Sequence, residues 1–183
     1  MINFNDGISE ILLTEEQIQA RVREMAAEIN EEYKGKDPVF VGVLRGVVVF
    51  FSDFIRNFND HCQMDFMCIS SYRGVNSSGE CIITKDVSTE LRGRHVVILE
   101  DIFDTGKSLD FCYAHLMAKK PASLKIVTLL DKPSRRKPWV TVKADYTGFT
   151  IPDKFVVGYG LDCNERYRNL PYIAVAKPEL YEK

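Results

Sequence analysis

A stretch near the middle of the chain combines acidic side chains with residue types that bind phosphate. The sequence VVILEDIFDTGKSL, residues 96–109, carries an apolar run, three acids and a Thr-Gly-Lys-Ser turn; the acids are Glu100, Asp101 and Asp104. Where a strand turns into a helix, free backbone N–H groups and the positive helix end favour a bound phosphate. Carboxylates repel phosphate, so the ligand must offer a second chemical feature beside its phosphate group.

The turn itself consists of Thr105, Gly106, Lys107 and Ser108. Gly106 permits close approach of the backbone to a ligand, while the hydroxyls of Thr105 and Ser108 add hydrogen-bond donors. The nucleotide-triphosphate loop G-x-x-x-x-G-K-[ST] is the obvious competitor. That loop requires glycine at position 101, which is Asp101 here, so the triphosphate interpretation fails.

Each acid also has an ordinary structural interpretation. Asp104 precedes the predicted helix and fits a helix N-cap, a common position for aspartate. Glu100 and Asp101 would then be solvated acids at the strand end. A ribose 5-phosphate reconciles both halves of the stretch, because its phosphate fits the turn while its hydroxyls reach the upstream acids. A hard cation such as Mg²⁺ would neutralise part of the acidic cluster and bind a second phosphate group.

The elements that must position these residues alternate along the chain. The segments predicted as strands are VFVGVL, QMDFMCISS, HVVILE, LKIVTLL, KFVVGYG and YIAVA, and helices are predicted from a capping box at residues 14–17 to Pro38, from Gly46 through VVVFFSDFIRNF, and from Lys107 to Lys119. Such alternation predicts an α/β fold with a mostly parallel central sheet covered on both faces. Ligands on these sheets bind beyond the carboxyl ends of the strands, so residues just after each strand matter most.

Length and composition exclude several classes of protein. A chain of 183 residues is expected to form one domain, residues 1–183. The net charge of −2 gives no broad attraction to nucleic acid or to an anionic membrane. The apolar runs are too short to span a bilayer, and the first ten residues lack a signal pattern. Five cysteines without a CxxC pair favour free thiols in a reducing cytoplasm.

Several separated motifs together resemble one enzyme family. Two hydrophobic residues, Glu-Asp, two hydrophobic residues and Asp-Thr-Gly-Lys-Ser are similar to the phosphoribosyl-diphosphate (PRPP) signature of type I phosphoribosyltransferases. The order and spacing of further motifs resemble the hypoxanthine (hypoxanthine-guanine) phosphoribosyltransferases: LRG at Leu44, SSY at Ser70, LLDKPSRR at Leu129, IPDKFVVGYGLD at Ile151 and RYRNLPYI at Arg166. The resemblance implies the type I fold, with a small hood formed by the terminal segments and a flexible lid at about residues 71–84.

The resemblance also implies a purine-salvage reaction. A 6-oxopurine, hypoxanthine or guanine, attacks PRPP through N9, and a nucleoside 5′-monophosphate and pyrophosphate form with Mg²⁺ as cofactor. Residues 105–108 would hold the 5-phosphate, and Glu100 and Asp101 would hold the ribose hydroxyls and, with Asp162, Mg²⁺. Asp104 matches the acid near purine N7 and is the candidate general base.

Four residues match the family's purine side. Lys132 corresponds to the lysine that faces the 6-oxo group; a lysine only donates, so it suits a carbonyl and disfavours the amine of adenine. The competing interpretation is that Lys132 belongs to a solvated basic run, which we accept for residues 135–137. Phe155 matches the stacking residue and Val156 supplies backbone contacts, although unaided both would be core strand residues. Asp162 matches a ligand of a second Mg²⁺ on the pyrophosphate.

The pyrophosphate-binding residues implied by the resemblance are Leu44, Arg45, Gly46 and Arg168. In the family, the peptide bond that corresponds to Leu44–Arg45 can be cis. Arg45 stands where some relatives carry lysine, and its planar fork leaves the ligand geometry open. Without the resemblance, Arg168 would be an ordinary surface arginine.

The lid implied by the resemblance begins at Ser71 and Tyr72 and would exclude water from the reacting sugar. An ordinary mobile hairpin has the same Gly/Ser/Asn-rich composition, so both interpretations stay open. Ser70 stands where some relatives carry lysine, which removes one basic contact of the lid.

Two other functions compete with the salvage enzyme. An RNA-binding regulator with the same fold would be expected to carry a basic stripe, and the slightly acidic balance argues against it. An adenine or pyrimidine phosphoribosyltransferase is disfavoured by Lys132 and the IPDKFVVGYG match. Beyond its substrates, we expect a homodimer or homotetramer that binds neither nucleic acid nor membrane.

Overall fold

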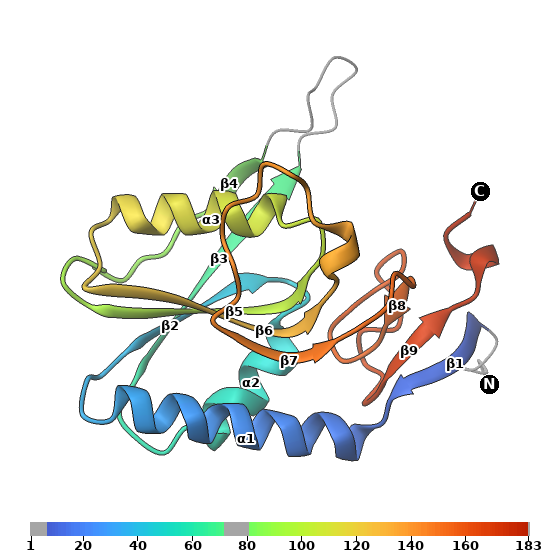
Figure 1. Ribbon diagram of the computed structural model, residues 1–183, viewed down its shortest axis with the longest axis horizontal. Coiled ribbons are helices and arrows are strands. Elements are labelled where there is room, and N and C mark those ends of the chain that lie inside the picture. Colours follow the sequence, from blue (N-terminus) through green and yellow to red (C-terminus); the bar gives the residue numbers. More distant parts are fainter. Residues whose placement is uncertain (1–6, 72–80, 183) are drawn as a thin grey trace.

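A six-stranded sheet forms the centre of the protein, for which the computed structural model describes residues 7–71 and 81–182 (Figure 1). The strand order is β4-β3-β2-β5-β6-β7, and all neighbours are parallel except β3 and β4. The strands are β2 Val39–Leu44, β3 Gln63–Ser71, β4 Cys81–Lys85, β5 His95–Phe103, β6 Ser123–Asp131 and β7 Tyr146–Thr150. The predicted α/β fold with a mostly parallel sheet is confirmed.

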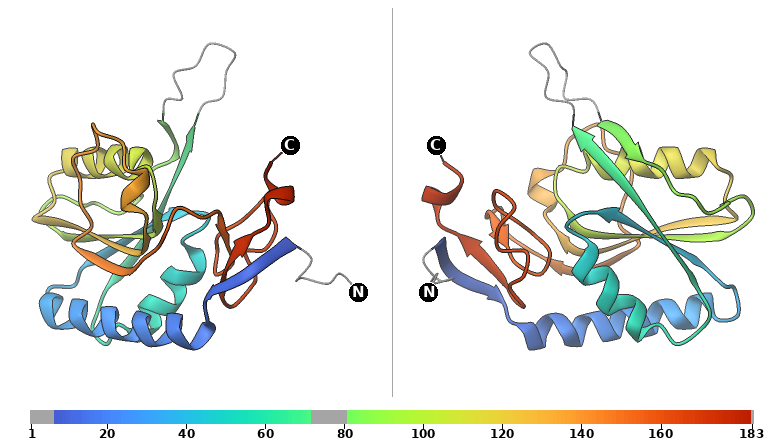
Figure 2. Two further views of the ribbon diagram at one scale, coloured as in Figure 1. Left: turned by 45° about the vertical axis from the view of Figure 1, so that its right-hand side comes forward. Right: turned by 180° about the vertical axis from the view of Figure 1, so that it is seen from behind.

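Helices cover both faces of this sheet. The helices α1 Glu15–Tyr33 and α2 Val48–Asn57 lie on one face, and α3 Lys107–Ala118 lies on the other (Figures 1 and 2). Each side has its own buried apolar cluster, one containing Ile18 and Phe50 and the other containing Leu109. Among the described residues, no helix combines the length and the apolar character needed to cross a bilayer.

The capping box predicted for the first helix is present. The backbone N–H of Gln17 donates to Thr14 Oγ1 (3.3 Å), and the Thr14 N–H donates to Gln17 Oε1 (2.9 Å). The predicted end at Pro38 is wrong, because α1 stops at Tyr33. Gly35 adopts a φ of 69° there and donates its N–H to Asp60 Oδ2 (2.7 Å), so the chain leaves the helix before the proline.

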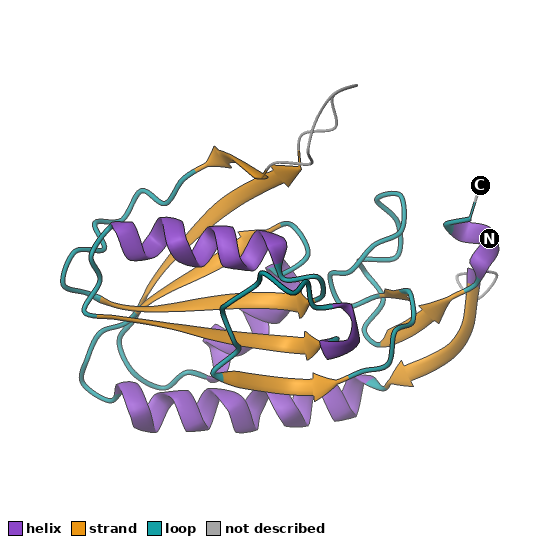
Figure 3. Cartoon of the chain, turned by 45° about the horizontal axis from the view of Figure 1, so that its top comes forward, coloured by secondary structure: helices purple, strands orange, loops and turns teal. Residues whose placement is uncertain are grey.

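A second, smaller sheet lies beyond the carboxyl ends of β5, β6 and β7 (Figure 3). It joins β1 Ile8–Leu13, β9 Ile173–Ala176 and β8 Val156–Val157 in antiparallel pairs. The strand predicted for KFVVGYG is therefore reduced to two residues. Gly158 and Gly160 have φ values of 98° and 99°, which turn the backbone away from the extended conformation.

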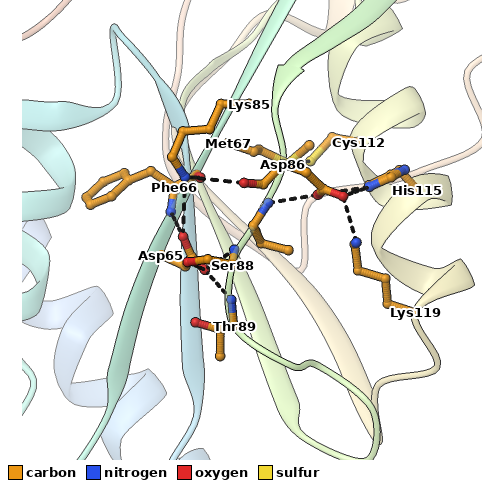
Figure 4. Close-up of polar contacts among 11 residues, drawn as sticks. Asp65, Phe66, Met67, Lys85, Asp86, Ser88, Thr89, Cys112, His115 and Lys119 are labelled. Carbon is orange, nitrogen blue, oxygen red and sulfur yellow. Dashed lines mark hydrogen bonds and ion pairs between the residues drawn. The ribbon is translucent and has the colours of Figure 1, made fainter.

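The base of the β3–β4 hairpin is fixed to the rest of the fold by carboxylates (Figure 4). Asp65 Oδ2 accepts the backbone N–H groups of Ser88 and Thr89, each at 2.7 Å. Asp86, just after β4, pairs with Nε2 of His115 on α3 (3.0 Å). These contacts hold the segment that follows β4 against β3 and against α3.

Candidate active site

The carboxyl ends of β2, β5 and β6 meet at the edge of the large sheet that faces the small sheet (Figure 3). This edge carries the Leu44–Gly46 segment, the stretch from Glu100 to Ser108, and Lys132, which follows β6 directly. Three segments that lie far apart in the sequence thus come together, as expected for a parallel sheet.

The Thr-Gly-Lys-Ser turn links the end of β5 to the start of α3. Gly106 is the N-cap of α3 with a φ of 84°, and it is buried. A Cβ at this position would lie 2.8 Å from side-chain atoms of both Phe103 and Val140, so no larger residue fits without a shift. Because Gly106 occupies the cap and no side chain bonds there, the interpretation of Asp104 as a helix N-cap is wrong.

The neighbouring acids Glu100 and Asp101 are both partly shielded from solvent, and their charges interact. Glu100 Oε2 is shielded from solvent, and no described group lies within hydrogen-bond distance of it. Burial, and next the charge of Asp101, raise the pKa of Glu100 well above its usual range. Burial also raises the pKa of Asp101 to about 6, although the N–H of Ile102 donates to its carboxylate (2.7 Å). The interpretation of Glu100 as a solvated strand-end acid therefore does not hold.

Asp104 lies beside two arginines that follow β6. Its Oδ1 pairs with Nε of Arg135 (3.3 Å), and its backbone carbonyl accepts from Nη1 of Arg136 (2.6 Å). The Arg136 guanidinium also stacks on the Phe103 ring, 3.1 Å from its centroid, and bonds to Asp131. The solvated interpretation is therefore wrong for Arg136, whose side chain is only 20% exposed.

Lys132 is buried, with 6% of its surface exposed. Its Nζ donates to the carbonyl of Lys154 (2.6 Å), and its backbone N–H donates to the carbonyl of Phe103 (3.0 Å). Burial lowers the pKa of Lys132, while the charges of Asp104 and Asp153 act in the opposite direction. The interpretation of Lys132 as part of a solvated basic run is thus wrong.

Phe155 and Val156 differ in their exposure. Val156 is buried in β8 as a core residue, whereas Phe155 is 39% exposed. The ring of Tyr181 stacks on Phe155, with centroids 4.5 Å apart and planes inclined by 13°. Phe155 therefore presents aromatic surface rather than filling a core position.

The Leu44–Gly46 segment lies between Asp101 and the loop of residues 158–168, which follows β8 and is called the small-sheet loop. The Leu44–Arg45 peptide bond is cis, as the family resemblance allowed. A Cβ at Gly46 would overlap the Asp101 carboxylate, and a Cβ at Gly160 would overlap the Gly46 carbonyl oxygen. Gly160 requires glycine because the Gly46 backbone approaches it closely, whereas a side chain at Gly46 would displace the Asp101 carboxylate.

The small-sheet loop joins its charges to that segment. Arg168 Nη2 pairs with Asp162 Oδ1 (2.9 Å) and with Glu165 Oε2 (3.2 Å). The same Glu165 oxygen accepts from Arg45 Nη1 (3.0 Å). Arg168 Nη1 donates to the carbonyl of Gly160 (2.8 Å), so Arg168 is not an ordinary surface arginine.

Part of the predicted site lies outside the described residues. Ser71 ends β3, and Tyr72 belongs to the interval 72–80, which the structure does not describe. The lid therefore stays a prediction.

Sequence reasoning missed three residues at this edge: Arg136, Glu165 and Tyr159, which is buried between Gly158 and Gly160 in the small-sheet loop. Arg136 makes contacts that depend on tertiary packing, and its local context resembles any basic surface run. A weak signal exists for the other two, since Glu165 stands three residues before Arg168 and Tyr159 stands between two glycines.

Comparison with known proteins identifies the family. Residues 9–164 match the model of the phosphoribosyl transferase domain. The chain belongs to this family. Phosphoribosyl transferase domains with curated names include the hypoxanthine-guanine phosphoribosyltransferase of Bacillus subtilis, which is 49% identical over 96% of this chain and 97% of its own length.

One curated relative is much longer than this chain. The bifunctional protein TilS/HprT of Listeria innocua is 45% identical over 99% of this chain, which spans only 28% of that relative.

Among solved phosphoribosyltransferase structures, a hypoxanthine phosphoribosyltransferase from Staphylococcus aureus superposes with a TM-score of 0.92 at 46% identity, with full coverage of both chains. A hypoxanthine-guanine phosphoribosyltransferase from Bacillus anthracis gives 0.85 at 42% identity and covers 93% of this chain and 98% of its own.

Proposed function

We propose that this phosphoribosyltransferase transfers the phosphoribosyl group of PRPP to a 6-oxopurine, hypoxanthine or guanine, and releases pyrophosphate. One observation carries the proposal. The turn of residues 105–108, the acid pair Glu100 and Asp101, and the buried Lys132 lie together at one edge of the large sheet. The names of the relatives from Bacillus subtilis and Bacillus anthracis support the choice of substrates.

The 5-phosphate of PRPP would bind at the turn of residues 105–108. The backbone N–H groups at the start of α3 and the hydroxyls of Thr105 and Ser108 are suitable donors for it. Glu100 and Asp101 would accept hydrogen bonds from the ribose hydroxyls. The unpartnered Glu100 Oε2 supports this role, because a buried carboxylate oxygen without a partner is costly.

Mg²⁺ fits this arrangement of acids. The raised pKa values of Glu100 and Asp101 reflect buried negative charge that a cation would relieve. Among the described residues, no group of three His, Cys, Asp or Glu side chains can hold a metal by itself. Glu100 and Asp101 would therefore share one Mg²⁺ with substrate oxygens and water, as is usual for this ion, and Asp162 would hold a second Mg²⁺ on the pyrophosphate. When bound, Mg²⁺ would neutralise charge on the departing pyrophosphate.

The purine would lie between Lys132 and Phe155. Lys132 is a donor in an enclosed position and would bind the 6-oxo group, and Phe155 would stack on the ring with one of its faces. The Val156 backbone would contact the purine edge. A site that donates to a carbonyl leaves the amine of adenine facing a cation, which disfavours adenine.

In the reaction, purine N9 forms a bond to ribose C1 while the C1–O bond to pyrophosphate breaks, with inversion at C1. Asp104 would accept the proton from N7 and stabilise positive charge on the sugar. Arg45, Gly46 and Arg168 would bind the pyrophosphate; the shared Glu165 contact supports a common location for the two arginines. Leu44 would contribute through its backbone.

The remaining predictions complete the proposal. Residues 1–183 would form one domain, with β1, β8 and β9 as the hood and residues 71–84 as a lid that excludes water from the sugar. Assembly as a homodimer or homotetramer, a cytoplasmic location, and no binding to nucleic acid or membrane stay predictions.

An ultraviolet assay with PRPP, Mg²⁺ and one base at a time tests the function. We expect turnover with hypoxanthine and guanine, and at least about 100-fold lower kcat/KM with adenine. Xanthine belongs in the same series, because the residues do not rank the three 6-oxopurines. Lack of product with all three 6-oxopurines would overturn the proposal.

A further inference from the structure

Two loops from distant parts of the chain would have to keep a fixed distance to bind pyrophosphate. The Leu44–Gly46 segment follows β2, whereas the loop of residues 158–168 follows β8 in the small sheet. The loops touch where Gly160 packs against the Gly46 carbonyl. Contact between two glycine backbones resists compression but not separation. The Arg45–Glu165 ion pair also joins the two loops (3.0 Å), but both side chains are more than 60% exposed and such a pair contributes little. A buried contact is therefore needed to hold the loops together.

Tyr159 provides an attachment within the second loop. It is only 2% exposed, and its backbone has a φ of 50°, between the two glycines. Its backbone N–H donates to the Leu170 carbonyl (2.8 Å), while its hydroxyl leaves the loop and donates to Asp53 Oδ2 (2.7 Å). Burial raises the pKa of Tyr159, and the bond to Asp53 raises it further, so the phenol stays a donor at every working pH.

Asp53 is a fixed acceptor because two helices hold it. It belongs to α2, which starts at Val48, two residues after the Leu44–Gly46 segment. Its Oδ2 also accepts from Nε2 of Gln19 on α1 (2.5 Å). The Tyr159 hydroxyl thus ties the second loop to the helix that continues from the first.

We propose that Tyr159 is a positioning residue, whose hydroxyl bond to Asp53 fixes the separation between the Arg45–Gly46 side and the Asp162–Arg168 side of the pyrophosphate site. The proposal rests on the proposed function. Tyr159 touches no reacting group; it acts by keeping Gly160, Asp162 and Arg168 at their places opposite Gly46.

The variant Tyr159→Phe removes only the hydroxyl. We expect its KM for PRPP, and its Kd for Mg²⁺-pyrophosphate measured by calorimetry, to rise about fivefold, the effect of losing one net hydrogen bond. The KM for hypoxanthine is expected to change by less than about twofold, because Lys132 bonds to the Lys154 carbonyl and Phe155 stacks on Tyr181, and neither contact involves the Tyr159 hydroxyl. This split separates positioning of the pyrophosphate end from general loosening of the fold.

Tyr146→Phe is the matched control. The Tyr146 hydroxyl also bonds to a carboxylate, that of Glu32 on α1, but Tyr146 begins β7 at the end opposite the site. We expect this variant to leave both KM values unchanged. A conservative pair gives a second readout: Asp53→Asn keeps an acceptor oxygen and should affect the KM for PRPP less than Asp53→Leu.

The outcomes separate the inference from the function on which it rests. An inactive wild-type protein would overturn the proposed function. An active wild type with an unchanged KM for PRPP in Tyr159→Phe would overturn the inference alone, as would equal rises in both KM values. If Tyr159→Phe does not fold, Gln19→Leu takes its place, because it releases Asp53 from α1. We expect about a twofold higher KM for PRPP in that variant, and no change would count against the proposal.

Discussion

At the end of β5, the acid pair that would bind the sugar also destabilises the free protein. The pKa of Asp101 is raised to about 6, mainly by burial, whereas an unfolded aspartate titrates near pH 4. A raised pKa favours folding below the unfolded value, and this contribution is lost as the pH rises through the folded value. Ionised Asp101 therefore destabilises the folded, ligand-free protein at neutral pH.

Asp101→Asn is expected to remove this destabilisation, because an amide does not ionise. At pH 8 the variant should be more stable than the wild type by about 2 to 3 kcal/mol, and the difference should vanish below about pH 4. Thermal unfolding of both proteins from pH 4 to 8 measures the effect. A variant less stable than the wild type at pH 8 would contradict the account.

Lys132 is a second buried residue, and its proposed role is to recognise the base. Lys132→Ala should lower kcat/KM for hypoxanthine by about tenfold or more and reduce the preference over adenine, because the 6-oxo group loses a charged donor. Lys137→Ala is the matched control, since Lys137 is an exposed lysine of the same basic run. An unchanged ratio of hypoxanthine to adenine activity in Lys132→Ala would remove Lys132 from base recognition.

Among the elements, the β3–β4 hairpin is fixed by two carboxylates, of which Asp65 accepts the larger number of backbone N–H groups. Burial by itself would raise the pKa of Asp65, but N–H donors from Thr89, Phe66 and Ser88 bring it well below its usual range. A lowered pKa stabilises the fold above the unfolded value, near pH 4, and this stability is lost as the pH falls through the folded value.

Asp65→Asn should therefore destabilise the protein by about 2 kcal/mol at pH 7, because an amide replaces a charged acceptor of several bonds. The deficit should stay constant down to about pH 5 and narrow below about pH 4. Urea unfolding at several pH values provides the measurement. A deficit that grows as the pH falls would contradict the role of the charge.

Apolar periodicity predicted most elements, because buried faces leave a regular pattern in the sequence. The strands β1, β4 and β7 were not predicted, and two predicted boundaries were wrong where a single backbone conformation decides. Gly35 ends α1 before Pro38, and Gly158 and Gly160 cut β8 to two residues. A glycine that adopts a positive φ is not distinguishable in sequence from one that does not.

For the molecule as a whole, the site was predictable to the extent that it lies in contiguous motifs at strand ends. The sheet topology alone brings residues 100–108 beside Lys132. By contrast, Arg136 contacts Phe103 and Asp104 across separate segments, and Tyr159 reaches Asp53 on a helix 106 positions away. Such contacts follow from tertiary packing, which a local pattern does not contain.

Pyrophosphate release from PRPP and hypoxanthine, measured together with Kd for PRPP in the wild type and in Asp104→Asn, tests the central claim most directly. The account predicts one pyrophosphate per nucleotide formed in the wild type. In Asp104→Asn it predicts a kcat lower by about 100-fold or more, with Kd for PRPP changed by less than about threefold. No pyrophosphate release by the wild type, or near wild-type kcat in Asp104→Asn, would contradict it.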